Sequence, residues 1–366
     1  MDMPNLEFAI VGCGAIARKH LLSIAACPGA RLAALCDVNE ERMEQLAALW
    51  QQETGDRGDI LRYTDIHELL SVSSISVIVV AVHSGLHAQI ARCALQANKH
   101  VVLEKPAVLS LRDADEIAKL ADEKQRIVQV CHQLRYRPLL RKIKKTIDEG
   151  LLGEIRLGSV KLRLNRSEDY YRAAAWRGTW EQDGGMLLNQ GIHAVDLLMW
   201  YLGSPRSVQG DLTFVRPFKE TEDIALGTVA FSNGTKGMIE ANSMTLPSNL
   251  EQSLFLLGDK GAISIGGESM ERIDRWYIQG REHALDEAQQ LMTDHNEHRY
   301  MYQALMDALQ GSRSADLVDL SESRGALELI FALYSSAATA RTQRLPLTDF
   351  DLSQLRFKKG QRPTDQ

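Results

Sequence analysis

The stretch "LEFAIVGCGAIARKH", residues 6–20, decides the fold of the first part of the chain. It begins with an apolar run typical of a buried strand, continues with two glycines and an alanine in the pattern G-x-G-x-x-A, and ends with helical spacing. Gly12 permits a tight turn, Gly14 lets a pyrophosphate approach the backbone, and Ala17 lets helix and strand pack closely. This pattern indicates a dinucleotide-binding site, with the diphosphate at the helix N-terminus.

Asp37 ends the next apolar run, about 20 residues further on, where dinucleotide-binding proteins place an acid. A carboxylate at this position accepts hydrogen bonds from the ribose hydroxyls and repels a 2′-phosphate. NAD is therefore the expected cofactor. Arg42 lies close by in the sequence and could hold a phosphate instead, so NADP stays open.

The following part of the chain alternates short apolar runs with helical patterns. Near-continuous apolar strands separated by helices predict an α/β domain with a doubly wound parallel sheet, covered on both faces. A polar stretch at 51–59 interrupts this alternation, and we expect it to be a surface loop. The further strands are expected at 31–38, 76–82, 100–105 and 126–132.

From about residue 150 the pattern changes to longer alternating strands. Ser-Asn-Gly at 232–234 and Gly-Asp-Lys-Gly at 258–261 each separate two such strands, which predicts two hairpins. Helical patterns return at 286–310 and 322–341. Long antiparallel strands with a few helices predict an α+β second domain.

Composition and charge exclude several classes of partner. With 366 residues, of which 45% are hydrophobic, the chain can fill more than one core, so two domains are expected. A net charge of -6 gives no reason to expect nucleic acid or an anionic membrane surface as a partner. No apolar run approaches the roughly 18 residues that a membrane-spanning helix needs, and the N-terminus lacks the pattern of a signal peptide.

The five cysteines contain no Cys-x-x-Cys pair. Such cysteine usage suits a reducing cytosol and argues against a disulfide framework or a zinc cage. We therefore expect a cytoplasmic protein without a bound metal ion.

A second candidate site is "VVLEKP", residues 101–106, in which a strand ends abruptly in Glu104 and Lys105. In an open parallel sheet, ligands bind beyond the carboxyl ends of the strands. A lysine there can hydrogen-bond a substrate hydroxyl, and its charge favours the alkoxide that forms before hydride leaves. A surface salt bridge at a strand end explains the pattern equally well.

Histidines near two helix starts suggest further sites. Ser84 is predicted to cap the helix that begins near residue 86, with His87 in its first turn and in contact with the cofactor. His83 and His87 have the spacing of a metal pair, but no third ligand is evident nearby. His295 and His298 are expected on a solvated helix face rather than in a metal site.

The stretch 184–203 predicts one helix on which Asn189, His193 and Asp196 share a face, at i, i+4 and i+7. Satisfied polar groups on a buried helix would explain this arrangement. The alternative is an active site, which requires partners from elsewhere in the chain.

Five stretches occur in the order seen in the glucose–fructose oxidoreductase/inositol dehydrogenase (Gfo/Idh/MocA) family, which the chain resembles over most of residues 6–265. They are "VGCGAIARKH", "SGLHAQIARCALQANKHVVLEKP", "RYRPLLRKIKKTIDEGLLGEI", "AWRGTWEQDGGMLLNQGIHAVDLLMWYLG" and "GDKGAISI". The resemblance implies a Rossmann domain in 1–135 and, in 136–366, a substrate-binding α+β domain with a large, open, mostly antiparallel sheet. That sheet usually packs against another subunit's, so a homodimer or homotetramer is expected.

The resemblance also implies hydride transfer between the nicotinamide of NAD(P) and a hydroxyl of a carbohydrate or cyclitol. Lys105 takes the position of the active-site lysine and His193 that of the proton-transfer residue. His193 would take the hydroxyl proton, because an imidazole titrates near working pH, and Lys105 would orient the same oxygen and stabilise its developing charge. The implied cofactor contacts are Gly12, Gly14, Ala15, Ile16, Asp37, Ser84, His87, Glu104, Trp176 and Arg177.

The substrate contacts are expected from the same stretch and from an Arg/Tyr cluster before it. Asn189 stands where many members have Asp, so we expect it to orient the substrate. Arg166 and Tyr171 are predicted substrate contacts, and their cluster suits a phosphate, a uronate or a neighbouring subunit. The sequence around this cluster resembles the branch that includes UDP-N-acetylglucosamine-uronate 3-dehydrogenases. The cluster consists of Arg163, Arg166, Tyr170, Tyr171 and Arg172.

Two other functions are compatible with the resemblance. Some relatives cleave glycosides by transient oxidation on a retained NAD, without net redox change. Others are ligand-sensing regulators without catalysis, although a sensor would not need both Lys105 and His193.

Overall fold

The computed structural model describes residues 6–281, 283–312, 316–347, 350–352 and 355. The chain forms two compact units. Unit 1 consists of the described residues of Met1–Val108, Arg112–Tyr136 and Asn296–Ser323. Unit 2 consists of the described residues of Leu109–Leu111, Arg137–His295 and Arg324–Gln366.

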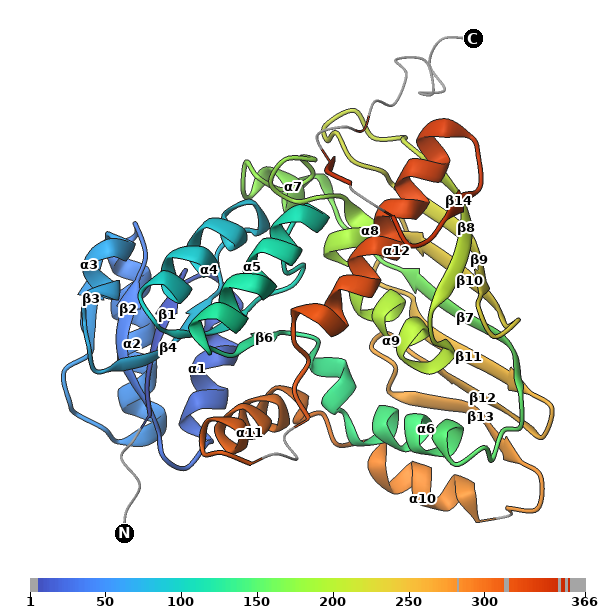
Figure 1. The fold of residues 1–366 in the computed structure, drawn as a ribbon, viewed down its shortest axis with the longest axis horizontal. Helices are drawn as coiled ribbons and strands as arrows, with labels where there is room; N and C mark the ends of the chain where they lie inside the picture. Colours follow the sequence, from blue (N-terminus) through green and yellow to red (C-terminus); the bar gives the residue numbers. More distant parts are fainter. Residues whose placement is uncertain (1–5, 282, 313–315, 348–349, 353–354, 356–366) are drawn as a thin grey trace. The chain divides into compact units, whose positions relative to one another are not determined.

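Unit 1 is built on a six-stranded parallel sheet with the order β3-β2-β1-β4-β5-β6 (Figure 1). The order reverses between β1 and β4, which creates the topological switch point where such sheets bind ligands. The predicted doubly wound parallel sheet is thus confirmed. Its strands are β1 (Leu6–Val11), β2 (Ala30–Cys36), β3 (Leu61–Tyr63), β4 (Ile75–Val80), β5 (His100–Leu103) and β6 (Val128–Val130).

The edge of this sheet differs from the expectation. The expected loop at 51–59 is wrong in its first part, because α2 continues to Thr54 and ends at Gly55 in a left-handed conformation. The short strand β3, which the sequence pattern did not predict, follows at the sheet edge with exposed Leu61. An exposed edge strand lacks the apolar run that identified the buried ones. The helical elements of unit 1 are α1 (Ala17–Ala25), α2 (Glu40–Thr54), α3 (Ile66–Leu70), η1 (Ser84–Leu86), α4 (His87–Gln96), α5 (Leu111–Lys124), η2 (Gln133–Tyr136) and α11 (Glu297–Leu309).

Helix α11 belongs to unit 1, whereas the expected division placed it in the second domain. Its apolar side carries Met301, Tyr302 and Leu305, which are fully buried in the same core as Phe8 and Leu21 of β1 and α1. Helical periodicity shows that such a face is buried, but it does not show against which sheet. The solvated position expected for His298 is only partly right, because this side chain is half-buried on α11 with its Nε2 atom buried, while His295 is exposed.

Unit 2 is built on an eight-stranded sheet with the order β13-β12-β11-β7-β10-β9-β8-β14 (Figure 1). Only the β7–β10 pairing is parallel among these strands. Both predicted hairpins are confirmed as β9–β10 and β11–β12, in a large and mostly antiparallel sheet. The strands are β7 (Ile155–Arg163), β8 (Pro205–Thr213), β9 (Ile224–Phe231), β10 (Lys236–Asn242), β11 (Glu251–Gly258), β12 (Gly261–Gly266), β13 (Arg272–Ile278) and β14 (Gln343–Arg344).

Helices pack on one face of this sheet where its strands carry glycines. A Cβ added to Gly158 would lie 2.6 Å from a Leu202 methyl of α9, and one added to Gly227 would lie 2.6 Å from Leu333 of α12. The glycines therefore let the two helices approach the strands closely. The helices of unit 2 are α6 (Pro138–Asp148), α7 (Glu168–Arg172), α8 (Met186–Asn189), α9 (Ile192–Leu202), α10 (Ala284–Leu291) and α12 (Leu320–Thr339).

The single helix predicted for 184–203 is in fact two helices, α8 and α9, separated at Gln190 and Gly191. The N–H groups of Gln190 and Gly191 both bond the carbonyl of Met186, which ends the first helix. Gly191 packs so closely on Leu187 that an added Cβ would lie 2.7 Å from its carbonyl oxygen. Asn189 and His193 therefore lie on different helices.

Among the described residues, no helix is long and apolar enough to cross a membrane.

Candidate functional site

The glycine loop between β1 and α1 has the features that a dinucleotide requires. Gly12 has φ +92°, and a Cβ added there would lie 2.7 Å from the backbone of Ala81 and Val82. Gly14 is the opposite case, since an added Cβ would meet no atom within 4 Å. This open side adjoins the start of α1, whose first turn carries no acidic residue. The loop therefore fits a diphosphate, with exposed Ala15 and half-buried Ile16 beside it.

Asp37 connects this loop to the end of β2. Its Oδ2 accepts a hydrogen bond of 2.6 Å from the N–H of Cys13, and its Oδ1 accepts one of 2.8 Å from Asn39. The carboxylate is half-buried, and each oxygen has capacity for a further donor. Its position beside the glycine loop is thus compatible with the ribose contact that the sequence predicts. Asn39 in turn caps α2 by accepting from the N–H of Arg42.

The loop after β4 differs from the predicted capping arrangement. Ser84 begins the turn η1, and α4 starts at His87 without a side-chain cap hydrogen bond. The buried His87 ring lies 2.8 Å from the carbonyl of Pro106 through Nδ1 and 3.1 Å from that of Val82 through Nε2. Burial lowers the pKa of His87, which outweighs the two carbonyls that raise it. A neutral ring has one N–H, so His87 donates to one carbonyl at a time, and the shorter contact favours that of Pro106 in the loop after β5.

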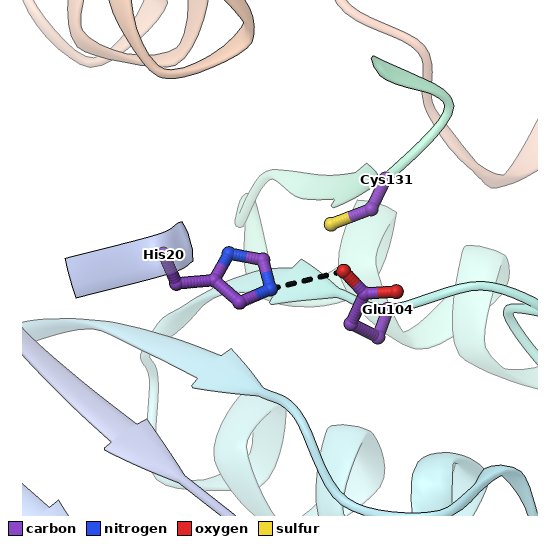
Figure 2. A group of neighbouring side chains, drawn as sticks. All are labelled: His20, Glu104 and Cys131. Carbon is purple, nitrogen blue, oxygen red and sulfur yellow. Dashed lines mark hydrogen bonds and ion pairs between the residues drawn. The ribbon is translucent and has the colours of Figure 1, made fainter. Parts of the chain in front are cut away.

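Glu104 directly follows β5 and is buried together with His20 and Cys131 (Figure 2). Its Oε2 accepts a hydrogen bond of 3.0 Å from the backbone N–H of Lys105, and its Oε1 lies 3.0 Å from Nε2 of His20. The other ring nitrogen of His20 lies 2.8 Å from the hydroxyl of Tyr302. Burial raises the pKa of Glu104, but the hydrogen bond and charge of His20 and the charge of Lys105 lower it further, to below its usual range. Glu104 is therefore ionised.

Cys131 completes this buried group, and Figure 2 shows its sulfur pointing toward the carboxylate and the ring. The possible ligand atoms of His20, Glu104 and Cys131 all lie within 4.8 Å of one another. Both ring nitrogens of His20 and both oxygens of Glu104 already have hydrogen-bond partners in the protein. We therefore interpret the group as a hydrogen-bonded network rather than a metal centre.

A polar cluster lies in unit 2 around the junction of α8 and α9. Asn189 donates its side-chain N–H to Asp183, and its carbonyl accepts a hydrogen bond of 3.1 Å from Gln190. Arg166 donates to the Gln190 side-chain carbonyl over 2.7 Å, and Gln190 donates to the hydroxyl of Tyr170. The amide pair and Arg166 are thus held in fixed orientations relative to one another.

Two guanidinium groups flank the ring of Tyr170. The Cζ atom of Arg177 lies 4.2 Å and that of Arg166 5.4 Å from the ring centroid. Arg177 also donates to the carbonyl of Tyr170, while its buried Nε has no hydrogen-bond partner among the described residues. The nearby carboxylate of Asp183 accepts from Asn189 and from the N–H of Gly178. Paired guanidiniums with spare donors suit an anionic ligand.

Other members of the predicted Arg/Tyr cluster lie elsewhere in unit 2. Tyr171 is buried, with the Nζ of Lys219 5.3 Å from its ring centroid, and burial raises the pKa of its hydroxyl to about 12. Arg163 binds the carboxylates of Glu240 and Glu251 on neighbouring strands. Arg172 pairs with Glu168 at exposed positions of α7. The structure thus places Tyr170 beside Arg166 and Arg177, whereas Tyr171 lies beside Arg216, whose Cζ atom is 5.3 Å from its ring centroid. Adjacent tyrosines at 170–171 gave no signal of which ring points inward.

His193 lies half-buried in the first turn of α9, and Asp196 is buried one turn further on. The preceding helix α8 is fixed by two residues that sequence reasoning missed. Glu222 accepts hydrogen bonds at Oε1 from the N–H of Leu187 and from the hydroxyl of Tyr334, over 2.8 and 2.7 Å. The two missed residues, Glu222 and Tyr334, are remote in sequence from α8, so no local pattern marks them.

A doubly wound dinucleotide-binding unit with Asp37 beside its glycine loop, joined to a second unit with a large open sheet, fits a nicotinamide-dependent oxidoreductase. Residues 6–132 match the "Oxidoreductase family, NAD-binding Rossmann fold", and residues 140–264 match the "GFO/IDH/MocA C-terminal domain". The chain belongs to the Gfo/Idh/MocA family, and it is an NAD(P)-dependent enzyme of the sugar and polyol dehydrogenase class.

Two solved structures are similar over nearly the whole chain. The WlbA dehydrogenase of Bordetella pertussis, in complex with NADH and UDP-GlcNAcA, is 33% identical, with a TM-score of 0.86 over 95% of this chain and 99% of the other. The WlbA dehydrogenase of Chromobacterium violaceum, with the same ligands, is 30% identical, with a TM-score of 0.85 over 95% and 98%. The scyllo-inositol 2-dehydrogenase (NADP(+)) of Bacillus subtilis is 32% identical over 43% of this chain and 44% of its own length.

Proposed function

We propose that this enzyme oxidises a ring hydroxyl of a UDP-linked N-acetylhexosaminuronate, such as UDP-GlcNAcA, with NAD⁺. The observation that carries the proposal is the cluster of Arg166, Tyr170 and Arg177 beside the two amides of unit 2. The chain as a whole carries a charge of -6, so attraction for such an anion must come from local groups. The similarity to dehydrogenases solved with UDP-GlcNAcA supports the same substrate class.

Each part of this substrate has a matching group in the cluster. The uronate and the diphosphate match guanidinium forks, which bind planar and multiply charged oxygens well. The sugar hydroxyls and the acetamide match the side-chain amides of Asn189 and Gln190. We assign the substrate role predicted for Tyr171 to Tyr170, whose ring contacts both guanidiniums.

Most of the proposed cofactor contacts lie on unit 1. Gly12, Gly14, Ala15 and Ile16 hold the diphosphate, Asp37 holds the ribose and Ser84 keeps its predicted contact. Trp176 and Arg177, which belong to unit 2, keep the cofactor contacts that the resemblance implies. Glu104 and His87 act on the cofactor through the loops that they hold, since both Glu104 oxygens and the N–H of His87 already bond the protein. When bound, the nicotinamide supplies the hydride acceptor.

Lys105 and His193 act on the reacting hydroxyl. His193 removes the O–H proton while the hydrogen on the same carbon leaves as hydride, so the C–OH group becomes a carbonyl. The proton goes to His193, and the hydride carries both electrons of the C–H bond to NAD⁺. Lys105 donates a hydrogen bond to the same oxygen and stabilises its developing negative charge. In the reverse direction His193 returns the proton.

The outer face of the unit 2 sheet supports the proposed homo-oligomer. Large apolar side chains are exposed there on β9, β10, β11 and β13, opposite the face covered by helices. We propose a second copy of this chain as the partner, in a homodimer or homotetramer. The exposed residues are Leu226, Met238, Leu257 and Tyr277.

The five cysteines are free thiols, which suits the proposed cytoplasmic location.

The test is NADH formation from NAD⁺ with UDP-GlcNAcA, with UDP-GlcNAc as the matched substrate that lacks the carboxylate. We expect turnover of the uronate and a KM for UDP-GlcNAc higher by about 10-fold or more, as for loss of a buried charge-assisted hydrogen bond. Arg166→Met should raise the KM for the uronate, whereas Arg172→Met, exposed on α7, should not.

Turnover of myo-inositol or free sugars in preference to both nucleotides would overturn the substrate class. NAD binding with glycoside cleavage but no NADH would favour redox-neutral chemistry.

A further inference from the structure

We propose that Tyr302, His20 and Glu104 form a buried chain of positioning residues that fixes the backbone of Lys105. The proposal rests on the role of Lys105 in the proposed function. It gives helix α11, which comes from the far end of the sequence and belongs to unit 1, an indirect part in catalysis through Tyr302.

The first link joins Glu104 to Lys105. The carboxylate accepts the backbone N–H of Lys105 through Oε2, at the point where β5 ends and regular strand pairing stops. An ionised, nearly fully buried carboxylate is a strong acceptor, and it holds this N–H in a low-dielectric environment. The position of the Lys105 Cα thus depends on the position of the Glu104 side chain.

The second link joins Glu104 to His20 of α1. The His20 ring is fully buried and uses both nitrogens, Nε2 toward Glu104 and Nδ1 toward the Tyr302 hydroxyl. Because an ionised carboxylate only accepts, Nε2 carries the hydrogen in this pair. On its other side the ring nitrogen Nδ1 lies 2.8 Å from the Tyr302 hydroxyl, so the tyrosine holds the ring in its orientation toward Glu104.

The third link joins His20 to Tyr302 of α11. Tyr302 lies 282 positions from His20 in the sequence, and α11 packs against α1. On the other side of Lys105, the carbonyl of Pro106 is held by His87. Two buried imidazoles thus hold the backbone around Lys105, one before and one after it. Misplacing a catalytic group by about 1 Å costs up to about 100-fold in rate, which is why such a support matters.

The test compares Tyr302→Phe with Tyr136→Phe. Both tyrosines are buried in unit 1, and the hydroxyl of Tyr136 accepts hydrogen bonds of 3.1 Å from Gln129 and from the N–H of Val318. Each variant therefore loses one buried hydroxyl, and that of Tyr302 contacts the His20–Glu104 pair. We expect Tyr302→Phe to lower kcat by between about 10-fold and 100-fold. The KM for the sugar nucleotide and the NADH Kd from fluorescence titration should stay within about twofold, since the lost support acts on the reacting oxygen. Tyr136→Phe should leave all three constants near wild type.

A second comparison places both tyrosine variants in a Lys105→Met background. If the chain acts through Lys105, Tyr302→Phe lowers the residual kcat no further there, because the two effects are not additive. A full additional loss in that background, or equal kcat for the two tyrosine variants, would overturn the proposal. Lys105→Met with wild-type kcat would instead refute the proposed function itself.

Discussion

At the scale of single residues, His193 carries the proposed proton transfer. It is half-buried in the first turn of α9, so replacing it removes a functional group without emptying the core. His193→Asn should lower kcat by about 100-fold to 10,000-fold, the usual contribution of a general base. The NADH Kd from fluorescence titration should stay near wild type. A variant with wild-type kcat would remove His193 from the mechanism.

The two glycines of the dinucleotide loop should fail in different ways. Gly12→Ala places a methyl 2.7 Å from the backbone of Ala81 at φ +92°, so we expect a loss of about 2 kcal/mol or more in unfolding free energy. Gly14→Ala meets no atom within 4 Å, so its melting temperature should equal that of the wild type.

The methyl of Gly14→Ala should instead block the approach of the diphosphate and raise the NADH Kd by about 10-fold or more. Thermal unfolding and NADH titration of both variants measure the two effects separately. Equal NADH affinity in wild type and Gly14→Ala would place the diphosphate elsewhere.

At the scale of the elements, His100 at the start of β5 makes the stability of the sheet depend on pH. Its Nδ1 accepts the backbone N–H of Ile127, and burial, helped by the charge of Arg126, lowers its pKa to about 4. Between about pH 6.5 and 4 the unfolded chain therefore binds a proton that the folded chain does not, so stability falls as the pH falls.

His100 alone should contribute roughly 2 kcal/mol of this loss. Urea unfolding at pH 7.5 and at pH 5 measures it. His100→Asn keeps an acceptor for Ile127 but does not titrate, so its unfolding free energy should change less between the two pH values. An identical pH dependence in both proteins would show that His100 is not responsible. His298 on α11, whose pKa is also lowered to about 4 by burial, contributes in the same direction and is unchanged in this comparison.

Helix boundaries also matter at this scale. The break between α8 and α9 separates Asn189 from His193, and it is fixed by Gly191 and by the contacts of Glu222 with the start of α8. Apolar periodicity continues through residues 184–203, so the pattern alone predicts one helix. The functional residues thus gain different orientations from a junction that the pattern does not reveal.

At the scale of the whole molecule, the open sheet of unit 2 should determine the oligomeric state. Met238 on β10 and Leu226 on β9 are 52% and 47% exposed, which is unusual for large apolar side chains on one sheet face. Met238→Asp together with Leu226→Lys should shift the protein toward monomer in light scattering after size exclusion. Val38→Asp together with Leu61→Lys, at exposed apolar positions of unit 1, is the control for the same added charges away from this sheet. A monomeric wild type would refute the proposed oligomer.

The sequence by itself determined the parts of this protein that depend on short-range patterns. Buried parallel strands appear as apolar runs and hairpins as turn residues between alternating runs, so both sheets could be predicted. Strand ends mark the ligand side of a parallel sheet, which singled out Gly12, Gly14, Asp37 and Lys105 before their surroundings were known. The helical pattern at 184–203 singled out His193, and the family resemblance added its proposed role.

Only the tertiary structure decided the contacts between residues remote in sequence. It placed α11 in unit 1, turned Tyr171 inward while leaving Tyr170 beside Arg166, and joined His20 to Glu104 and Tyr302. Periodicity records that a side chain is buried, but burial against one partner or another leaves the same pattern. Such partners are fixed by packing and hydrogen bonding across the fold, and these exist only once the chain has folded.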